Sequence, residues 1–98
     1  MHTVVWTITV NEGTSKQDIL EGIEASGRRE YQDVPGLIRA CFGFAADGKS
    51  VVEIYLWQSK PDAEQFFTHE WETDVARRWQ SAPMRRQDWE TPLVVEGR

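Results

Sequence analysis

Residues 51–67 constrain the fold of this chain more than any other stretch, because their hydrophobic pattern changes from the period of a strand to that of a helix. Residues 51–57 alternate as a β-strand does, and both sides of that strand are occupied. One side holds Val51, Glu53, Tyr55 and Trp57, and the other holds Val52, Ile54 and Leu56. From Ser59, which suits a helix N-cap, the spacing becomes helical, with Pro61 and Asp62 in the first turn and an apolar stripe beginning at Ala63, Phe66 and Phe67. The stretch predicts a strand that runs directly into a helix.

Alternation predicts three further strands, over residues 3–10, 37–44 and 85–96. Because Pro92 cannot donate to a sheet ladder, we expect the last strand to lie at an edge or to carry a bulge. Asp47 and Gly48 stand between the second and third strands and predict a tight hairpin. In the second strand we expect one side to carry Ile38, Ala40, Phe42 and Phe44. The opposite side should carry Leu37, Arg39 and Cys41.

The first helix is expected after a turn at residues 11–13, where Thr14 and Gln17 have the spacing of a capping box, and to end at Pro35 and Gly36. Its apolar stripe consists of Ile19, Leu20, Ile23, Tyr31 and Val34. Ser26 and Gly27 leave a gap in that stripe. The gap fits a weakened helix, because glycine costs about 1 kcal/mol relative to alanine, and it fits a cavity beneath the helix equally well.

The second helix continues through Trp71, Val75 and Trp79, with a kink expected near Thr68 and His69. The predicted order of strand, helix, strand, strand, helix, strand is the split βαβ order of a ferredoxin-like α+β fold, in one domain over residues 1–98. Helices would cover one face of the sheet. Packing against a second copy would bury Val52, Ile54 and Leu56 on the other face, which predicts a homodimer.

Composition excludes several classes of partner. Sixteen acidic residues against eleven basic give a net charge of −5, which argues against nucleic acid and anionic membranes. We find neither a signal sequence nor an apolar run of membrane-spanning length, so a soluble cytoplasmic protein is expected. The single cysteine, Cys41, lies in an apolar run and is predicted to be a buried free thiol rather than a nucleophile.

Residues 43–50 satisfy the letter pattern of a phosphate-binding P-loop. A P-loop needs a helix after it, whereas a strand is predicted from Val51, so we interpret the glycines as part of the hairpin. The chain has two histidines, His2 and His69, and one cysteine, Cys41, so it offers few of the usual ligands for a metal site. The chain also lacks a nucleophile elbow and a dinucleotide fingerprint. We therefore expect no cofactor and no metal.

Three segments, PGLIRACFGF at 35–44, VVEIYLWQSKPDAEQFF at 51–67 and TPLVVE at 91–96, resemble the YdhR-type family of predicted monooxygenases in the dimeric α+β barrel superfamily. The resemblance covers nearly the whole chain. It implies the dimeric α+β barrel fold. That superfamily includes oxygenases needing no metal or flavin, haem-degrading enzymes, isomerases and proteins with no known reaction. In the oxygenase relatives a strand-one asparagine, a strand-three tryptophan and a histidine or tyrosine of the second helix line a pocket. Trp57 matches the tryptophan and His69 lies on that helix, but strand one has no asparagine before Asn11.

We accordingly predict a ligand pocket between the helices and the sheet, lined by Trp6, Tyr55, Trp57, His69, Trp71 and Arg39. Aromatic walls with a few polar groups suit a small, flat aromatic molecule. The alternative is that the rings only fill the core and that His69 is solvated.

Two classes of function stay open. In a cofactor-independent monooxygenase of hydroquinone-like or polycyclic phenols, His69 or Tyr55 would help to deprotonate the substrate, Trp57 would join them in the catalytic group, and Arg39 would stabilise the anion. In a binding or carrier protein the same pocket would do no chemistry. A third and weaker possibility is a haem-handling protein with His69 as axial ligand.

Overall fold

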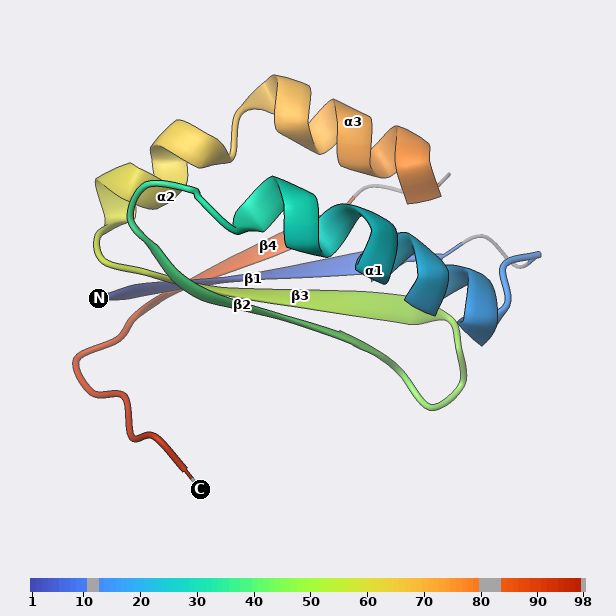
Figure 1. The fold of residues 1–98 in the computed structure, drawn as a ribbon, viewed down its shortest axis with the longest axis horizontal. Helices are drawn as coiled ribbons and strands as arrows, with labels where there is room; N and C mark the ends of the chain where they lie inside the picture. Colours follow the sequence, from blue (N-terminus) through green and yellow to red (C-terminus); the bar gives the residue numbers. More distant parts are fainter. Residues whose placement is uncertain (11–12, 80–83, 98) are drawn as a thin grey trace.

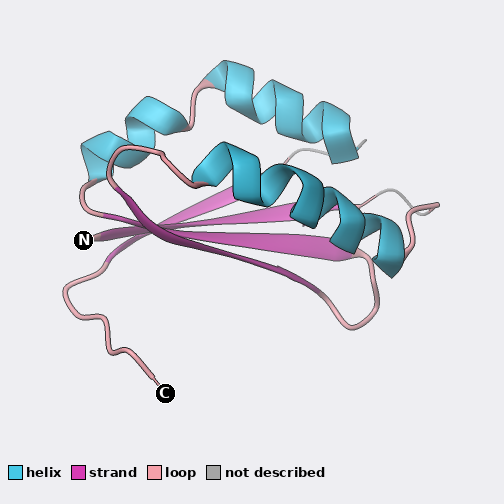
Figure 2. Cartoon of the chain, in the orientation of Figure 1, coloured by secondary structure: helices cyan, strands magenta, loops and turns pink. Residues whose placement is uncertain are grey.

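The structure is a computed structural model that describes residues 1–10, 13–79 and 84–97, without the side chains of residues 25–30, 78 and 79. Its elements are β1 (His2–Thr9), α1 (Lys16–Tyr31), β2 (Leu37–Phe44), β3 (Ser50–Trp57), α2 (Lys60–Phe66), α3 (His69–Trp79) and β4 (Arg85–Glu90). The strands form an antiparallel sheet in the order β2-β3-β1-β4, and the helices lie together on one face of it (Figure 1). Figure 2 shows the two layers. This arrangement confirms the predicted ferredoxin-like α+β fold.

The first helix begins one residue later than predicted. Ser15, not Thr14, is its N-cap, and the capping box is completed by the Asp18 carboxylate, which accepts a hydrogen bond from the Ser15 backbone N–H. A carboxylate accepts more strongly than the Gln17 amide and also suits the positive end of the helix dipole. The backbone of α1 is continuous past Ser26 and Gly27 and ends at Tyr31, so the predicted end at Pro35 is too late. The side chains at the gap in the stripe lie outside the described residues.

The predicted kink of the second helix is a complete break. Ser59 caps α2, as expected, by accepting a hydrogen bond from the Asp62 backbone N–H. Phe67 then leaves the helical conformation, with φ −84° and ψ 74°. The Thr68 hydroxyl accepts a hydrogen bond from the Trp71 backbone N–H at 3.1 Å, which caps a new helix, α3.

A β-bulge in β2 changes the side to which its first residues point. Leu37 pairs with Trp57 and Arg39 with Leu56, so Ile38 is an extra residue in the edge strand. Leu37, Ala40 and Phe42 pack against the core, whereas Ile38 is exposed. The prediction that Ile38 shares a side with Ala40 is therefore wrong.

The hairpin between β2 and β3 has the predicted turn, with Gly48 at φ +72°. Because β3 starts at Ser50 and no helix follows the glycines, the hairpin interpretation of the P-loop pattern is confirmed. The last strand lies at an edge, as predicted, but β4 ends at Glu90, well short of residue 96. The tail after it turns to the sheet face away from the helices (Figure 1), where Arg39 pairs with Glu96. Ala82 and Pro83 lie outside the described residues.

The two faces of the sheet differ in burial. Val4, Trp6 and Ile8 of β1 point to the helices and are at most 1% exposed. On the other face Ile54 is 39% exposed, and Cys41, which pairs with Ile54, is exposed too. The prediction of a buried thiol is wrong, because no helix covers this face. Within the described ranges, no helix has the length and apolar character that a membrane span requires.

Candidate functional site

The pairing register arranges the helix-facing side chains in rows across the sheet. One row holds Asp88, Val4, Tyr55 and Ala40, and the next holds Arg86, Trp6, Glu53 and Phe42. Each row therefore runs from a charged residue of β4, across the buried centre, to an apolar residue of β2. The rows bring Glu53 between two aromatic neighbours, although its carboxyl group is ionisable.

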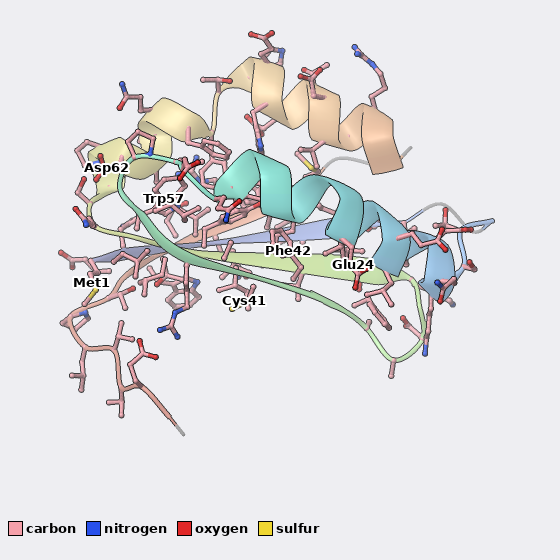
Figure 3. The ribbon with its side chains drawn as sticks, viewed as in Figure 1. Met1, Glu24, Cys41, Phe42, Trp57 and Asp62 are labelled. Carbon is pink, nitrogen blue, oxygen red and sulfur yellow. The ribbon has the colours of Figure 1, made fainter. Side chains whose placement is uncertain are left out.

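The space between these rows and the helices is filled by aromatic rings. Phe67 is the centre of this aromatic cluster and contacts Trp71, Tyr55, Trp57 and Trp6, at ring-centroid distances of 4.7, 4.9, 5.4 and 5.5 Å. Trp57 lies between the sheet and α2 (Figure 3). Such edge-to-face contacts stabilise a core by about 0.5–1.5 kcal/mol per pair beyond the area that they bury.

Three indole N–H groups in this cluster have no hydrogen-bond acceptor among the described residues. They belong to Trp6, Trp57 and Trp71. Trp6 and Trp57 are at most 1% exposed. A buried donor without an acceptor costs about 1–3 kcal/mol, and buried tryptophans usually find a partner. The aromatic cluster therefore holds indole N–H groups whose hydrogen-bonding capacity the described residues do not use.

Glu53 and Tyr55 form a buried polar pair. Glu53 is 4% exposed, and the Tyr55 hydroxyl donates a hydrogen bond of 2.5 Å to its Oε1 atom. Burial raises the pKa of Tyr55 far above its ordinary value, and the charge of Glu53 and hydrogen bonds with Glu53 and Tyr31 raise that pKa further. Tyr55 is therefore a neutral phenol at physiological pH. It can donate or pass on a proton, and its part in the deprotonation of a substrate stays a prediction.

A cavity of about 390 Å³ lies beside edge strand β2, within the usual size range of small-molecule sites. Its lining residues are Tyr31, Gln32, Leu37, Ile38, Arg39, Ala40 and Phe42. Tyr31, at the end of α1, and Phe42 separate the cavity from Tyr55, with ring centroids 5.5 and 6.0 Å from that of Tyr55. The candidate site is thus a cavity lined by both apolar and polar side chains, with a buried Tyr–Glu pair directly behind its inner wall.

The structure brings together four of the six predicted pocket residues. Trp6, Tyr55, Trp57 and Trp71 all belong to the aromatic cluster. Their rings contact one another and those of Phe66 and Phe67, so the cavity lies beside them rather than between them.

The other two predicted residues lie elsewhere. Arg39 lines the cavity, but its guanidinium pairs with Glu96 and is not an inward anion partner. His69 is exposed. It precedes Trp71 by two residues, about 200° around the helix, and Trp71 takes the inner side. The expected place of His69 in the pocket wall is therefore wrong.

Sequence reasoning missed the roles of Glu53 and Tyr31. Glu53 carries the signal that could have found it, since a carboxylate at an inward position of an apolar strand must be buried with a partner. Tyr31 was assigned only to the apolar stripe of the first helix, and its contact with Tyr55 depends on tertiary packing.

A polar network closes the opposite side of the aromatic cluster, along β4. His2 Nε2 lies 2.7 Å from the Asp88 carboxylate, and Arg86 donates hydrogen bonds to Asp88 and, at 2.5 Å, to Glu64 of α2. The Arg86 guanidinium also lies over the rings of Trp6 and Phe67, 5.7 and 5.5 Å from their centroids. Arg86 therefore connects α2 to the sheet.

Because of this network, we expect the free energy of unfolding to depend on pH in the acid range. Partial burial raises the pKa of Asp88, but the hydrogen bonds and charges of Arg86 and His2 outweigh it, so the net pKa is lowered. A lowered pKa stabilises the fold above the unfolded-state value of about 3.9, and this contribution is lost as the pH falls through the folded-state pKa. The Asp88 side chain is 32% exposed, so the effect should stay below about 1 kcal/mol.

Urea unfolding at pH 7 and pH 3 tests this expectation. Asp88→Asn should lose stability at pH 7 and little at pH 3, whereas Glu24→Gln, at an exposed position of α1, should change neither value. Equal losses at both pH values would contradict the assignment.

Within residues 1–10, 13–79 and 84–97, we find no cluster of three His, Cys, Asp or Glu side chains placed to hold a metal ion. No protein-family model matches the sequence. No curated protein matches it either.

The fold of this chain is similar to those of several solved structures. It is similar to a monooxygenase from the gene ActVA-Orf6 of Streptomyces coelicolor in complex with nanaomycin D, with a TM-score of 0.72 and 16% identity over 99% of this chain and 92% of that one. It is also similar to SnoaB, a cofactor-independent oxygenase from Streptomyces nogalater, with a TM-score of 0.70 and 16% identity over 98% and 97% of the two chains.

A further similar structure is a variant of MhuD with two manganese protoporphyrin IX molecules bound per active site. Its TM-score is 0.70 and its identity 15%, over 99% of this chain and 100% of that one. At these identities the likeness shows a shared ferredoxin-like α+β fold.

Proposed function

We propose that this protein is a cofactor-independent monooxygenase of the YdhR type that acts on a small hydroquinone-like or polycyclic phenol. The observation that carries the proposal is the cavity beside β2, whose inner wall, Tyr31 and Phe42, is in ring contact with Tyr55. A flat ring would stack on these residues, and Gln32 would supply a polar contact. Two proteins of the same fold support the reaction class, one a cofactor-independent oxygenase and one a monooxygenase in complex with nanaomycin D.

The reaction needs no redox group from the protein. A phenol and dioxygen become a quinone and water: a ring C–H bond and the O–O bond break, one oxygen forms the new C=O group, and the other leaves as water. The substrate supplies all the electrons that oxygen receives, provided that it is first deprotonated. The protein must therefore bind, exclude water and stabilise an anion. Trp57 supports the last role, because it pairs with Leu37 of the cavity wall and has an unpartnered N–H.

Oxygen consumption by metal-free protein, across a panel of hydroquinones and polycyclic phenols, tests the proposal. We expect Trp57→Phe, which keeps a ring and removes the N–H, to lower turnover by about 10-fold, the loss of one charge-assisted hydrogen bond. Trp89→Phe is the matched control, because Trp89 is 56% exposed on β4. His69→Ala should also leave turnover unchanged, since its side chain lies outside the site. No oxygen consumption with any member of the panel would overturn the proposal.

A carrier function is the second candidate, favoured by the neutral state of Tyr55 and by the lack of a strand-one asparagine before Asn11. Micromolar binding of the same compounds without turnover would establish it. A haem-handling function has weaker support, because His69 is exposed and His2 Nε2 is paired with Asp88. A Soret band on haem addition that His69→Ala abolishes would promote it.

We also propose that the protein is a homodimer in which the uncovered sheet faces pack together. Val52 and Ile54 lie on that face, and Leu93 and Val95 of the tail are 74% and 78% exposed. A second copy would remove this apolar surface from water. Sedimentation should show a dimer at micromolar concentration, and the Cys41 thiol should react more slowly with a thiol reagent as protein concentration rises. Ile54→Glu should give a folded monomer with a fast-reacting thiol, and a wild-type monomer would contradict this interface.

A further inference from the structure

A continuous line of hydroxyl and carboxyl groups leads from the cavity into the core. Tyr31 lines the cavity. Its ring lies 5.5 Å from that of Tyr55, and hydrogen bonding between the two side chains is one of the causes that raise the pKa of Tyr55. The Tyr55 hydroxyl in turn donates to Glu53 Oε1 at 2.5 Å. A ligand in the cavity is therefore connected to Glu53, although Glu53 itself is 4% exposed.

We propose that Glu53 is the proton acceptor of this site, and that Tyr31 and Tyr55 relay the proton to it from a phenolic substrate. The inference rests on the proposed function, and it names the base that the reaction needs. Tyr55 donates to Glu53 in the resting structure, so its proton is already directed at the acceptor. The same geometry leaves the Tyr55 oxygen able to receive the proton of Tyr31.

The transfer is balanced without any redox change. The substrate O–H bond breaks and its proton passes to Tyr31, the Tyr31 proton passes to Tyr55, and the Tyr55 proton forms an O–H bond on Glu53. Both tyrosines are neutral before and after the step, which suits Tyr55, because burial and the neighbouring Glu53 disfavour its phenolate form. The products are a substrate anion in the cavity and a neutral carboxylic acid in the core.

Other described bases are less well placed for this role. Asp88 and Glu64 are both paired with Arg86 on the far side of the aromatic cluster. His2 is held by Asp88 at the same side, and His69 is exposed. Glu96 is bonded to the cavity residue Arg39 but is exposed, whereas Glu53 is a buried carboxylate that hydrogen bonds connect to the cavity wall.

The test follows the ionisation of a bound probe and the turnover together. The probe is 2-naphthol, whose absorption moves to longer wavelength when it ionises, added at a pH where the free probe is neutral. Wild-type protein should bind it as the naphtholate, and an infrared difference spectrum should show a new protonated carboxyl band. Glu53→Gln, which keeps an acceptor for Tyr55 but cannot take a proton, should bind 2-naphthol with similar affinity in its neutral form and without that band.

Turnover of the best substrate should fall by about 10²–10⁴-fold in Glu53→Gln, the usual contribution of a general base. Tyr31→Phe, which breaks the relay and leaves Glu53 in place, should give a comparable loss, whereas Glu24→Gln should give none. Naphtholate bound equally by wild type and Glu53→Gln would overturn the relay alone. Ionised binding by wild type without oxygen consumption would support the relay and refute the oxygenase. No binding at all would overturn both.

Discussion

Replacing Trp6 by alanine should lower the free energy of unfolding by about 3–5 kcal/mol, the usual cost of truncating a buried aromatic side chain. Trp6 is 1% exposed and its ring contacts those of Phe67 and Trp71, so its loss would leave a cavity in the centre of the aromatic cluster. It would also remove the ring under the Arg86 guanidinium. Because a domain of this size is stable by only about 5–15 kcal/mol, Trp6→Ala should be close to unfolding at room temperature.

Equilibrium unfolding in urea measures this loss, with Trp89→Ala as the control for removing an indole from a strand. Trp89 is 56% exposed in the single chain but lies on the face that the proposed dimer would cover, so at protein concentrations low enough to give the monomer its replacement should cost less than about 1 kcal/mol. Trp6→Phe should recover a large part of the loss, since it keeps a ring and removes an unpartnered N–H. Similar costs for Trp6→Ala and Trp89→Ala would show that the aromatic cluster is not the core of the fold.

Gly36→Ala is the second change with a large expected effect. Gly36 has φ +80°, a conformation that costs an L-residue about 1–2 kcal/mol. A Cβ atom there would also overlap the Asp62 side chain, including its own Cβ, and Asp62 cannot move without disturbing its hydrogen bond with Ser59 at the start of α2. The overlap should add about 1–3 kcal/mol, as overpacking does elsewhere.

Gly48→Ala is the matched control for the backbone term. Gly48 has a similar φ, +72°, but a Cβ there would meet only carbons of the Lys16 side chain, at 3.7 Å, an ordinary contact. The difference between the two variants, measured by thermal and urea unfolding, should isolate the overlap with Asp62. Equal losses would show that Asp62 adjusts freely and that the start of α2 tolerates the change.

The features that follow from local spacing were predictable. The change of period at residues 51–67 specified β3 and α2, and Ser59 has the predicted capping role. The hairpin followed from Asp47 and Gly48, since turn geometry depends on those residues themselves. From these elements the order of the sheet and the single helical layer could be derived.

Features that depend on a partner strand or on competing caps were not predictable. The bulge at Ile38 exists only in the pairing of β2 with β3, and it reverses the expected side of that residue. The break after Phe67 depends on Thr68. Its hydroxyl accepts a hydrogen bond from the Trp71 backbone N–H and so caps a new helix, a role that it would not have inside a continuous helix. This break and the new helical phase after it determine that Trp71 points inward and His69 outward.

The site was predictable in its composition but not in its position. Trp6, Tyr55, Trp57 and Trp71 do come together, yet the size of Phe66 and Phe67 fills the space expected between them. The cavity instead lies where the edge strand β2, with its bulge, comes close to the end of α1. No single segment of the sequence determines how these two elements are placed relative to each other. The pairing of Tyr55 with Glu53 was visible as an inward carboxylate, but only the structure shows which group it binds.

The position of β1 has a consequence for how the chain is made. Of the four strands, the central strand β1 is synthesised first, but its partners β3 and β4 come much later in the sequence. Until they emerge, Val4, Trp6 and Ile8 form a nascent apolar segment with both hydrogen-bonding edges open. The sheet can therefore close only after β4 has been synthesised, and a stalled chain that lacks β4 is a natural substrate for a chaperone that holds extended apolar segments.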